Sequence, residues 1–248
     1  MLTRENLNGV WAGVPTPWTS TGDFDDEAFA DNVARLCAAG VHGVYTTGTT
    51  GEFYSLTEDE FRRMVKAFAD ATRGTGVPTQ VGCTWADTRG CIWRAQIAAD
   101  HGVDGLQASL PFWSRMNDDE VVQFFADLSR ACPGLPIVHY NNPNSKRSLD
   151  ARLYQRVAAE VPALIGTKQV TTDLNTLIEL FVGVPELNHF ASDWLLAPFM
   201  MLGAKGTYSA LALFNPKLTL DWYGKCVRGA NGRRRSKFRG KCSDRSSR

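Results

Sequence analysis

The sequence feature that most constrains the fold is a short glycine motif that occurs three times. Residues 39–44 (AGVHGV), 101–106 (HGVDGL) and 202–207 (LGAKGT) each hold two glycines three positions apart, between an amphipathic stretch and an apolar run. The first glycine suits the left-handed residue that ends a helix, and the second lets the backbone turn tightly into a strand. Three junctions of the same kind predict a repeated unit of strand and helix.

Eight segments of the chain have the pattern of short buried strands. They are residues 10–15, 43–47, 79–83, 105–109, 137–141, 164–168, 188–192 and 206–210. Helical patterns lie between them, and Thr57 and Asn117 are each followed by an acid three residues on, as in helix N-caps. Because strands that alternate with helices form parallel sheets, eight such units predict a closed (β/α)8 TIM barrel. An open doubly wound sheet is the competing fold.

The charge of the chain is divided between a body and a tail. From Arg228 onward there are nine Lys or Arg residues and one acid, so this segment carries +8; because the whole chain carries +1, residues 1–227 carry −7. We expect residues 1–227 to form the barrel domain and the basic residues 228–248, which lack apolar periodicity, to be disordered. A nucleic-acid-binding arm is one interpretation of this tail. We favour a non-native end, because the acidic body gives a nucleic-acid partner no other support.

Other broad classes of protein find little support in the sequence. No apolar run reaches the roughly 18 residues that a membrane span needs, and residues 1–8 lack the apolar core of a signal peptide. The six cysteines form no C-x-x-C pair, and none lies near a histidine at zinc-ligand spacing. We therefore expect a cytoplasmic protein with reduced thiols, no metal site and no membrane partner.

Lys168 is the residue that points most directly to chemistry. It ends a predicted strand whose two faces should both be covered, and in barrels of this kind the reactive groups lie at the carboxyl ends of the strands. Burial disfavours the ammonium form and lowers the pKa of a lysine, and a neutral amine can attack a ketone. A lysine that extends its charged end to solvent is the alternative interpretation.

Two other strand ends provide possible partners for Lys168. Tyr140 ends the fifth predicted strand, where a phenol could transfer protons, although an aromatic ring packed at the rim is the alternative. Residues 48–52 (GTTGE) follow the second strand, and their hydroxyl and N–H groups suit a carboxylate or phosphate. An ordinary glycine turn is equally compatible with this segment. Taken together, these groups favour a site at the barrel mouth.

In these motifs the chain resembles the dihydrodipicolinate synthase and N-acetylneuraminate lyase family. The resemblance runs from about residue 10 to residue 216 and is carried by residues 14–17 (VPTP), 48–52 (GTTGE), 140–143 (YNNP), 166–168 (GTK), 203–206 (GAKG) and 215–216 (NP). It implies that Lys168 forms a Schiff base with pyruvate or a related 2-oxo acid, that Thr49 and Thr50 bind the carboxylate, and that Tyr140 relays protons. It also implies a homotetramer and a reaction without a metal or other cofactor.

The chain departs from the dihydrodipicolinate synthases near the aldehyde site. Ser145 stands where those enzymes have a carboxylate-binding Arg, and Trp113 replaces a Tyr donated across the subunit interface. Residues 111–116 look more like hydratase-aldolases that cleave arylidene pyruvates, in which Trp113 could stack on an aromatic aldehyde, or it could simply pack between subunits. We expect Gly48, Ser192 and Tyr208 to shape the same pocket.

These observations lead to one functional hypothesis and two alternatives. The leading hypothesis is a carbon–carbon lyase of the class I aldolase type that acts on a 2-oxo acid and an aldehyde. The alternatives are a 4-hydroxy-tetrahydrodipicolinate synthase and a truncated, inactive member of the family, because the family's C-terminal helical extension is missing from the sequence. Missing helices would expose apolar barrel surface, so we expect poor solubility or a changed oligomer.

Overall fold

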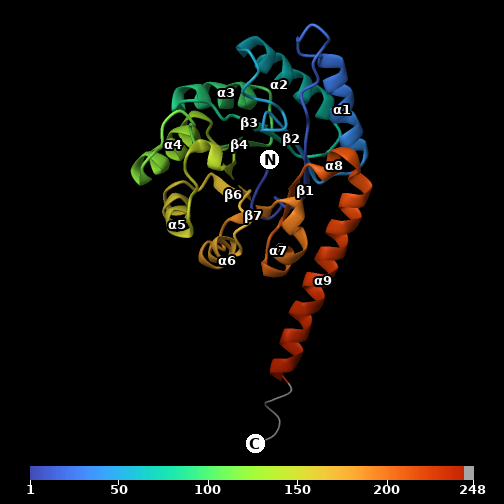
Figure 1. Ribbon diagram of the computed structural model, residues 1–248, viewed down its shortest axis with the longest axis vertical. Coiled ribbons are helices and arrows are strands. Elements are labelled where there is room, and N and C mark those ends of the chain that lie inside the picture. Colours follow the sequence, from blue (N-terminus) through green and yellow to red (C-terminus); the bar gives the residue numbers. More distant parts are fainter. Residues whose placement is uncertain (243–248) are drawn as a thin grey trace, which may run out of the picture.

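The computed structural model describes the backbone of residues 1–242 and the side chains of residues 1–229. Eight parallel strands form a closed barrel in sequence order, and β8 pairs with β1 (Figure 1). The strands are β1 Gly9–Gly13, β2 Gly43–Thr46, β3 Thr79–Gly82, β4 Gly105–Ala108, β5 Ile137–Asn141, β6 Leu164–Gln169, β7 Asn188–Ala191 and β8 Gly206–Ser209. The predicted (β/α)8 barrel is thus confirmed, and the open sheet is excluded.

Helices surround the barrel and begin where the sequence provides caps (Figure 1). They are α1 Asp26–Ala38, α2 Glu58–Thr72, α3 Thr88–Asp100, α4 Asp118–Ala131, α5 Ala151–Glu160, α6 Leu174–Gly183, α7 Leu196–Leu202, α8 Leu211–Phe214 and α9 Pro216–Cys242, with 3₁₀ turns at Pro143–Ser145 and Asp193–Leu195. Each of α1 to α6 has an N-cap side chain that accepts a backbone N–H. The predicted capping boxes at Thr57 and Asn117 are confirmed, and such caps contribute about 1 kcal/mol each.

The first glycine of each copy of the repeated motif ends a helix, as the spacing predicted. Gly40, Gly102 and Gly203 have φ values of 78°, 72° and 118°, as residues that end helices do. The second glycine matters for packing: a Cβ at Gly206 would lie 1.9 Å from the carbonyl oxygen of Gly9. The motif therefore ends a helix at its first glycine, and at Gly206 the second glycine lets β8 and β1 approach closely at the amino end of the barrel.

The barrel interior changes from apolar to polar along the strands. At the amino ends, Leu2 and Leu7 belong to an interior cluster with Trp11 and Phe190. The ring of Tyr208 stacks on Trp11, with ring centroids 5.8 Å apart. The Tyr208 hydroxyl donates a hydrogen bond to the buried Gln80, further along the barrel interior. A bulky apolar layer thus closes one end of the barrel, and the carboxyl ends of the strands are left for chemistry.

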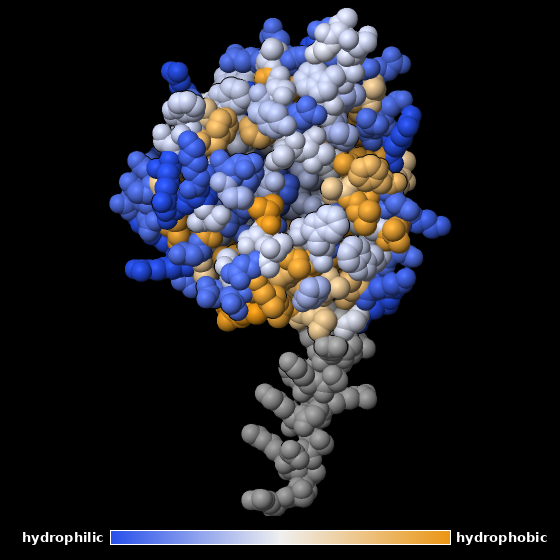
Figure 2. All heavy atoms as spheres, viewed as in Figure 1, coloured by the Kyte–Doolittle hydropathy of each residue, from blue (hydrophilic) through white to orange (hydrophobic). Residues whose placement is uncertain are grey.

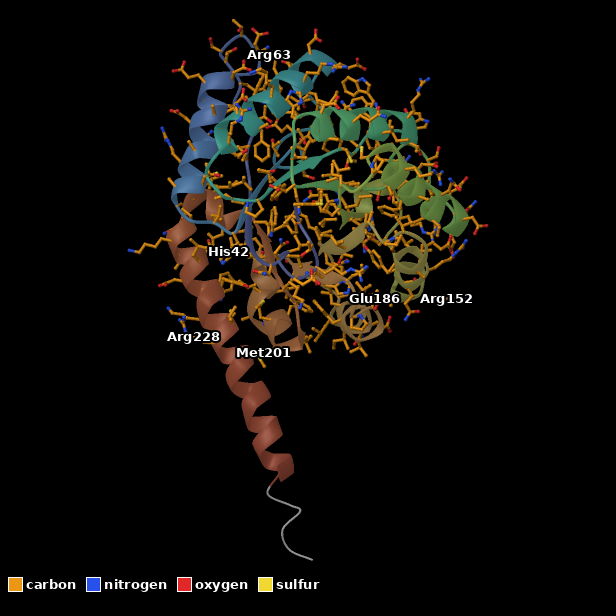
Figure 3. All side chains as sticks on the ribbon, turned by 180° about the vertical axis from the view of Figure 1, so that it is seen from behind. His42, Arg63, Arg152, Glu186, Met201 and Arg228 are labelled. Atoms are coloured by element: carbon orange, nitrogen blue, oxygen red, sulfur yellow. The ribbon has the colours of Figure 1, made fainter. Side chains whose placement is uncertain are left out.

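Helix α9 begins inside the predicted barrel domain and continues past its predicted boundary after residue 227. It packs against α7 and α8, and the Tyr223 ring meets His42 edge-on, with ring centroids 5.1 Å apart, just before the amino end of β2. Figure 3 labels His42. Residues 228–242 continue α9 as helical backbone. The expected boundary after residue 227 and the expected disorder of residues 228–248 stay predictions. Residues 243–248 lie outside the described part of the chain.

Among the described residues, no helix is both long enough and apolar enough to pass through a lipid bilayer. The five cysteines described, at positions 37, 83, 91, 132 and 226, are free thiols.

Candidate active site

Lys168 lies at the carboxyl end of β6 with its side chain inside the barrel. It pairs in register with Tyr140 of β5, so that the two side chains point in the same direction. Only 9% of Lys168 is exposed, and burial lowers its pKa to about 7. A large fraction of this amine is therefore neutral at physiological pH, which is the state that attacks a carbonyl carbon.

Three phenol rings surround the amine of Lys168. Its Nζ lies 3.9 Å from the ring centroid of Tyr140, 4.6 Å from that of Tyr45 and 5.3 Å from that of Tyr208. The Lys168 side chain is thus in the predicted place, beside Tyr140. The aromatic faces exclude water from the amine, and exclusion of water is the cause of its lowered pKa.

The turn after β2 brings the predicted threonines to the same place. The Thr49 hydroxyl lies 3.4 Å from the Tyr140 hydroxyl. Burial raises the pKa of Tyr45, and a hydrogen bond with Thr50 partly offsets this rise. The backbone here is strained, because the non-glycine residues Thr47 and Glu52 have φ values of 52° and 45°. Such strain is typical of functional turns that the surrounding structure holds in place.

Tyr45 is the residue of this site that the sequence did not reveal. Its hydroxyl oxygen accepts a hydrogen bond from Lys168 Nζ at 3.2 Å, the shortest polar contact of the amine in the described structure. It lies on β2 in register with Gln80 of β3. The alternation of side chains along the strand was the available clue, since Gly43 and Tyr45 share the inward face.

A layer of uncharged polar side chains lies in the barrel beside Tyr45 and Tyr208. Tyr208 donates to Gln80 Oε1 at 2.8 Å, which places this predicted pocket residue in the barrel interior below the mouth. Gln107 is buried, and neither its amide nitrogen nor its oxygen has a protein partner. A Cβ on Gly48 would lie 3.3 Å from that oxygen. Unpaired buried amides of this kind are typical of places where water or a ligand supplies the partner.

A cavity of about 190 Å³ opens beside Thr49 at the barrel mouth. Phe53, Tyr54 and Phe112 supply its aromatic walls, and the buried Ser145 closes one side. Ser145 uses its hydroxyl internally, donating to the carbonyl of Asn142 at 2.6 Å. The cavity beside Thr49 therefore combines three aromatic rings with small polar side chains, with no Lys, Arg or acid among the described residues that line it.

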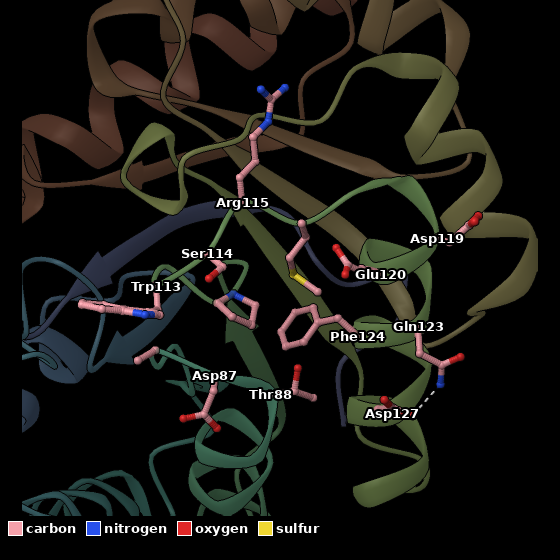
Figure 4. Close-up of a pocket in the computed structure, with 13 residues that line it drawn as sticks. Asp87, Thr88, Trp113, Ser114, Arg115, Asp119, Glu120, Gln123, Phe124 and Asp127 are labelled. Atoms are coloured by element: carbon pink, nitrogen blue, oxygen red, sulfur yellow. Dashed lines mark hydrogen bonds between the residues drawn. The ribbon is translucent and has the colours of Figure 1, made fainter.

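Trp113 lies away from this cavity in the single chain. Its side chain is 75% exposed, and it lines a separate cavity of about 690 Å³ between the starts of α3 and α4 (Figure 4). Lys146 donates to the Trp113 carbonyl at 2.5 Å and fixes the loop. Stacking of Trp113 on a substrate therefore remains a prediction.

Ser192 and its neighbour Asp193 follow β7. The Ser192 hydroxyl is buried and has no protein partner. Asp193 accepts hydrogen bonds from Thr207, Ser209 and two backbone N–H groups at the start of α8, all between 2.9 and 3.0 Å. Asp193 therefore holds the end of β8 to the start of α8 by hydrogen bonds. The Ser192 hydroxyl has no such bond within the described residues.

The fold and this site define a (β/α)8 barrel protein that buries a weakly basic lysine among phenols at the carboxyl ends of its strands. The chain belongs to the dihydrodipicolinate synthetase family, whose model matches residues 6–241.

Among its relatives are two kinds of named enzyme. The trans-O-hydroxybenzylidenepyruvate hydratase-aldolases of Sphingobium xenophagum and Pseudomonas aeruginosa are each 33% identical to the chain, over 177 and 230 residues respectively. These matches cover 68% and 89% of this chain but only 54% and 64% of those proteins, so the chain spans less than two thirds of their length. A 4-hydroxy-tetrahydrodipicolinate synthase of Methanopyrus kandleri is 28% identical over 221 residues, which are 88% of this chain and 73% of that protein.

Solved structures share the fold of this chain. The dihydrodipicolinate synthase of Agrobacterium tumefaciens superposes with a TM-score of 0.84 at 26% identity and covers 94% of this chain and 80% of its own. A prophage protein of the family from E. coli K12, solved in complex with pyruvate, gives a TM-score of 0.84 at 24% identity, covering 91% of this chain and 78% of its own.

Proposed function

We propose that the protein is a Schiff-base-forming lyase that acts on pyruvate or a related 2-oxo acid. The observation that carries the proposal is the position of the Lys168 amine, buried with a pKa of about 7 and 3.9 Å from the Tyr140 ring. The proposal is supported by membership of a family with named aldolases and synthases. Thr49 and Thr50 would hold the carboxylate of the substrate.

The proposed reaction needs only groups that the site holds. The neutral amine adds to the keto carbon, and loss of water gives an iminium. Its positive charge draws electrons from the adjacent carbon, so that a C–C bond one carbon further on can break and release an aldehyde. The substrate hydroxyl loses its proton as this bond breaks, and Tyr140, in contact with the amine and 3.4 Å from Thr49, is placed to accept it and to return it to the carbon of the enamine that remains. Water then hydrolyses the resulting iminium, which frees pyruvate and the Lys168 amine.

We propose further that the aldehyde partner is aromatic. Phe53, Tyr54 and Phe112 line the cavity beside Thr49 together with small polar side chains. By the family resemblance, Ser145 stands where a synthase would use Arg. An arylidene pyruvate would then take up one water and yield an aryl aldehyde and pyruvate. A dihydrodipicolinate synthase would need a cation for the second carboxylate, and the described residues that line the cavity include none. The expected cytoplasmic location stays a prediction, as does the expectation of poor solubility or of an oligomer other than the family's homotetramer.

Product formation distinguishes these substrates. The purified protein would be given a panel of arylidene pyruvates, and separately pyruvate with aspartate semialdehyde, while aldehyde release and condensation are followed by absorbance and chromatography. We expect pyruvate and aryl aldehyde in equal amounts, with at least about a thousandfold loss in Lys168→Met. Turnover of aspartate semialdehyde alone would reject the aromatic assignment, and no turnover of either would favour the inactive alternative.

A further inference from the structure

Tyr45 makes a contact with the reacting amine that the proposed mechanism has not used. Its hydroxyl oxygen is 3.2 Å from Lys168 Nζ, and the lysine is the donor of this hydrogen bond. The two residues are on β2 and β6, on different sides of the barrel, so the bond crosses the interior. This contact is long-range in the chain and depends on closure of the barrel.

The barrel leaves room for the Tyr45 ring at two glycines. A Cβ on Gly13 would lie 2.7 Å from the Tyr45 hydroxyl oxygen, and a Cβ on Gly48 would lie 3.1 Å from its Cε2. Any other residue at Gly13 would therefore displace the phenol. The Tyr45 ring also meets Tyr208 edge-on, with centroids 5.2 Å apart, which limits its rotation. The hydroxyl is thus held at one height in the barrel.

The groups that face the Lys168 amine carry no formal charge in the described structure. Tyr45, Tyr140 and Tyr208 approach it from β2, β5 and β8, and the first and last of these are fully enclosed phenols. From the other strands the interior side chains are Trp11, Gln80, Gln107 and Phe190. Asp193 is the one acid with an electrostatic effect on Tyr45, and its carboxylate is already bonded to β8 and α8. Burial raises the pKa of Tyr45, so it stays a neutral phenol.

We propose that Tyr45 is a positioning residue for the Lys168 amine. Its oxygen accepts one N–H, so the nitrogen lone pair is directed away from β2 and toward the mouth, where Tyr140 and Thr49 lie. When the amine adds to a keto carbon and water leaves, the iminium keeps one N–H, and Tyr45 accepts that proton's hydrogen bond as well. The bond to the charged iminium is stronger than the bond to the amine, so Tyr45 also favours the intermediate. This inference rests on the proposed Schiff-base function.

The pH dependence of imine trapping tests this role. Wild-type protein and Tyr45→Phe would be mixed with pyruvate and borohydride from pH 5 to 9, and the rate of mass gain on Lys168 measured. Wild type should show an acid limb with a midpoint near the Lys168 pKa of about 7. In Tyr45→Phe we expect the plateau rate to fall about tenfold and the midpoint to move down by about half a unit or more, because the ammonium loses a stronger hydrogen bond than the amine does.

Two further variants guard against a folding artefact. Gly13→Ala keeps the hydroxyl but pushes it away, and should move the midpoint in the same direction. Tyr154→Phe removes another fully buried phenol, one bonded to His139 at 2.6 Å and outside the contacts of Lys168; it should lower the melting temperature and leave the midpoint in place.

Each outcome has one meaning. If wild type gives no adduct on Lys168, the proposed function falls and this inference falls with it. If wild type reacts and neither Tyr45→Phe nor Gly13→Ala changes the midpoint or plateau, only the role of Tyr45 is overturned. An equal shift in Tyr154→Phe would likewise overturn it, because the effect would then come from general loosening of the barrel.

Discussion

At Lys168 the reactivity and the cost to folding have the same physical origin. The phenol rings around the amine exclude water, which leaves the amine neutral enough to attack a carbonyl. The same exclusion means that folding must either bury a charge or release a proton. We therefore expect the site to be destabilising at neutral pH, as functional sites often are.

Replacing the lysine should reveal this cost. The folded pKa of about 7 lies below the ordinary value of 10.5, so between these values the unfolded chain binds more protons and stability rises with pH. Below pH 7 the burial of Lys168 lowers the free energy of unfolding by its full amount, and above pH 10.5 this loss of stability disappears. Lys168→Met should therefore be more stable than wild type at pH 7 by on the order of 2–4 kcal/mol, and the difference should shrink toward pH 10. Urea unfolding at both pH values measures it, and a difference independent of pH would contradict the account.

Tyr140 should be required for proton transfer. Tyr140→Phe keeps the ring beside the amine but removes the hydroxyl that lies 3.4 Å from Thr49. We expect kcat for C–C cleavage to fall about 10²-fold or more, since general acid–base groups contribute this much. Tyr223→Phe, a phenol on α9 at the amino end of the barrel, is the matched control and should keep kcat within about twofold. A loss of less than about fivefold in Tyr140→Phe would remove it from the mechanism.

At the scale of elements, the turn after β2 is held by close backbone packing. A Cβ on Gly51 would lie 2.6 Å from the backbone nitrogen of Thr47, which is itself at a positive φ. Gly51→Ala must shift the turn, so that the threonine hydroxyls and N–H groups no longer meet a carboxylate together. KM for the 2-oxo acid should rise about tenfold or more. Gly229→Ala adds the same methyl group in open space on α9 and should leave KM unchanged; an unchanged KM in Gly51→Ala would show that this turn does not bind substrate.

The contact between β5 and α5 should set the acid stability of the barrel. His139 on β5 is fully buried against Tyr154 of α5, and burial lowers its pKa to about 3. Between pH 6.5 and about 3 the unfolded chain therefore binds one more proton, so this histidine's contribution to stability falls as the pH falls. The slope should be about 1.4 kcal/mol per pH unit. His139→Asn should flatten the dependence in urea unfolding from pH 6.5 to 4, and an unchanged slope would contradict the assignment.

The sequence was a good guide to elements and to groups at strand ends. The glycine motifs, N-caps and apolar runs are local patterns, so all eight strands could be predicted, and Lys168 and Tyr140 with them. Tyr45 and Gln107 could not be predicted as readily. Both faces of these strands are covered, so they lack the polar and apolar alternation that would say which side chains point inward. The contact of Tyr45 with Lys168 depends on closure of the barrel, which is a long-range property.

At the scale of the whole molecule, an exposed apolar surface predicts self-association. Phe214 is 85% exposed, and Trp194, Met201, Leu202 and Leu218 are also exposed. Figure 2 shows hydrophobic residues gathered on the face near α7 and α8. We expect concentration-dependent association in size-exclusion chromatography and sedimentation, weakened in Phe214→Ser/Leu218→Ser. A stable, well-behaved tetramer, or a monomer at all concentrations, would contradict this expectation.

Chemical trapping of the Lys168 amine shows whether this lysine forms the proposed Schiff base. The protein would be incubated with pyruvate and borohydride at pH 7.5, digested, and mapped by mass spectrometry, with Lys168→Arg as the matched variant. We predict one pyruvate-derived adduct on the peptide that holds Lys168 in wild type, and none at that position in the variant. An adduct on other lysines alone, or none at all, would contradict the account.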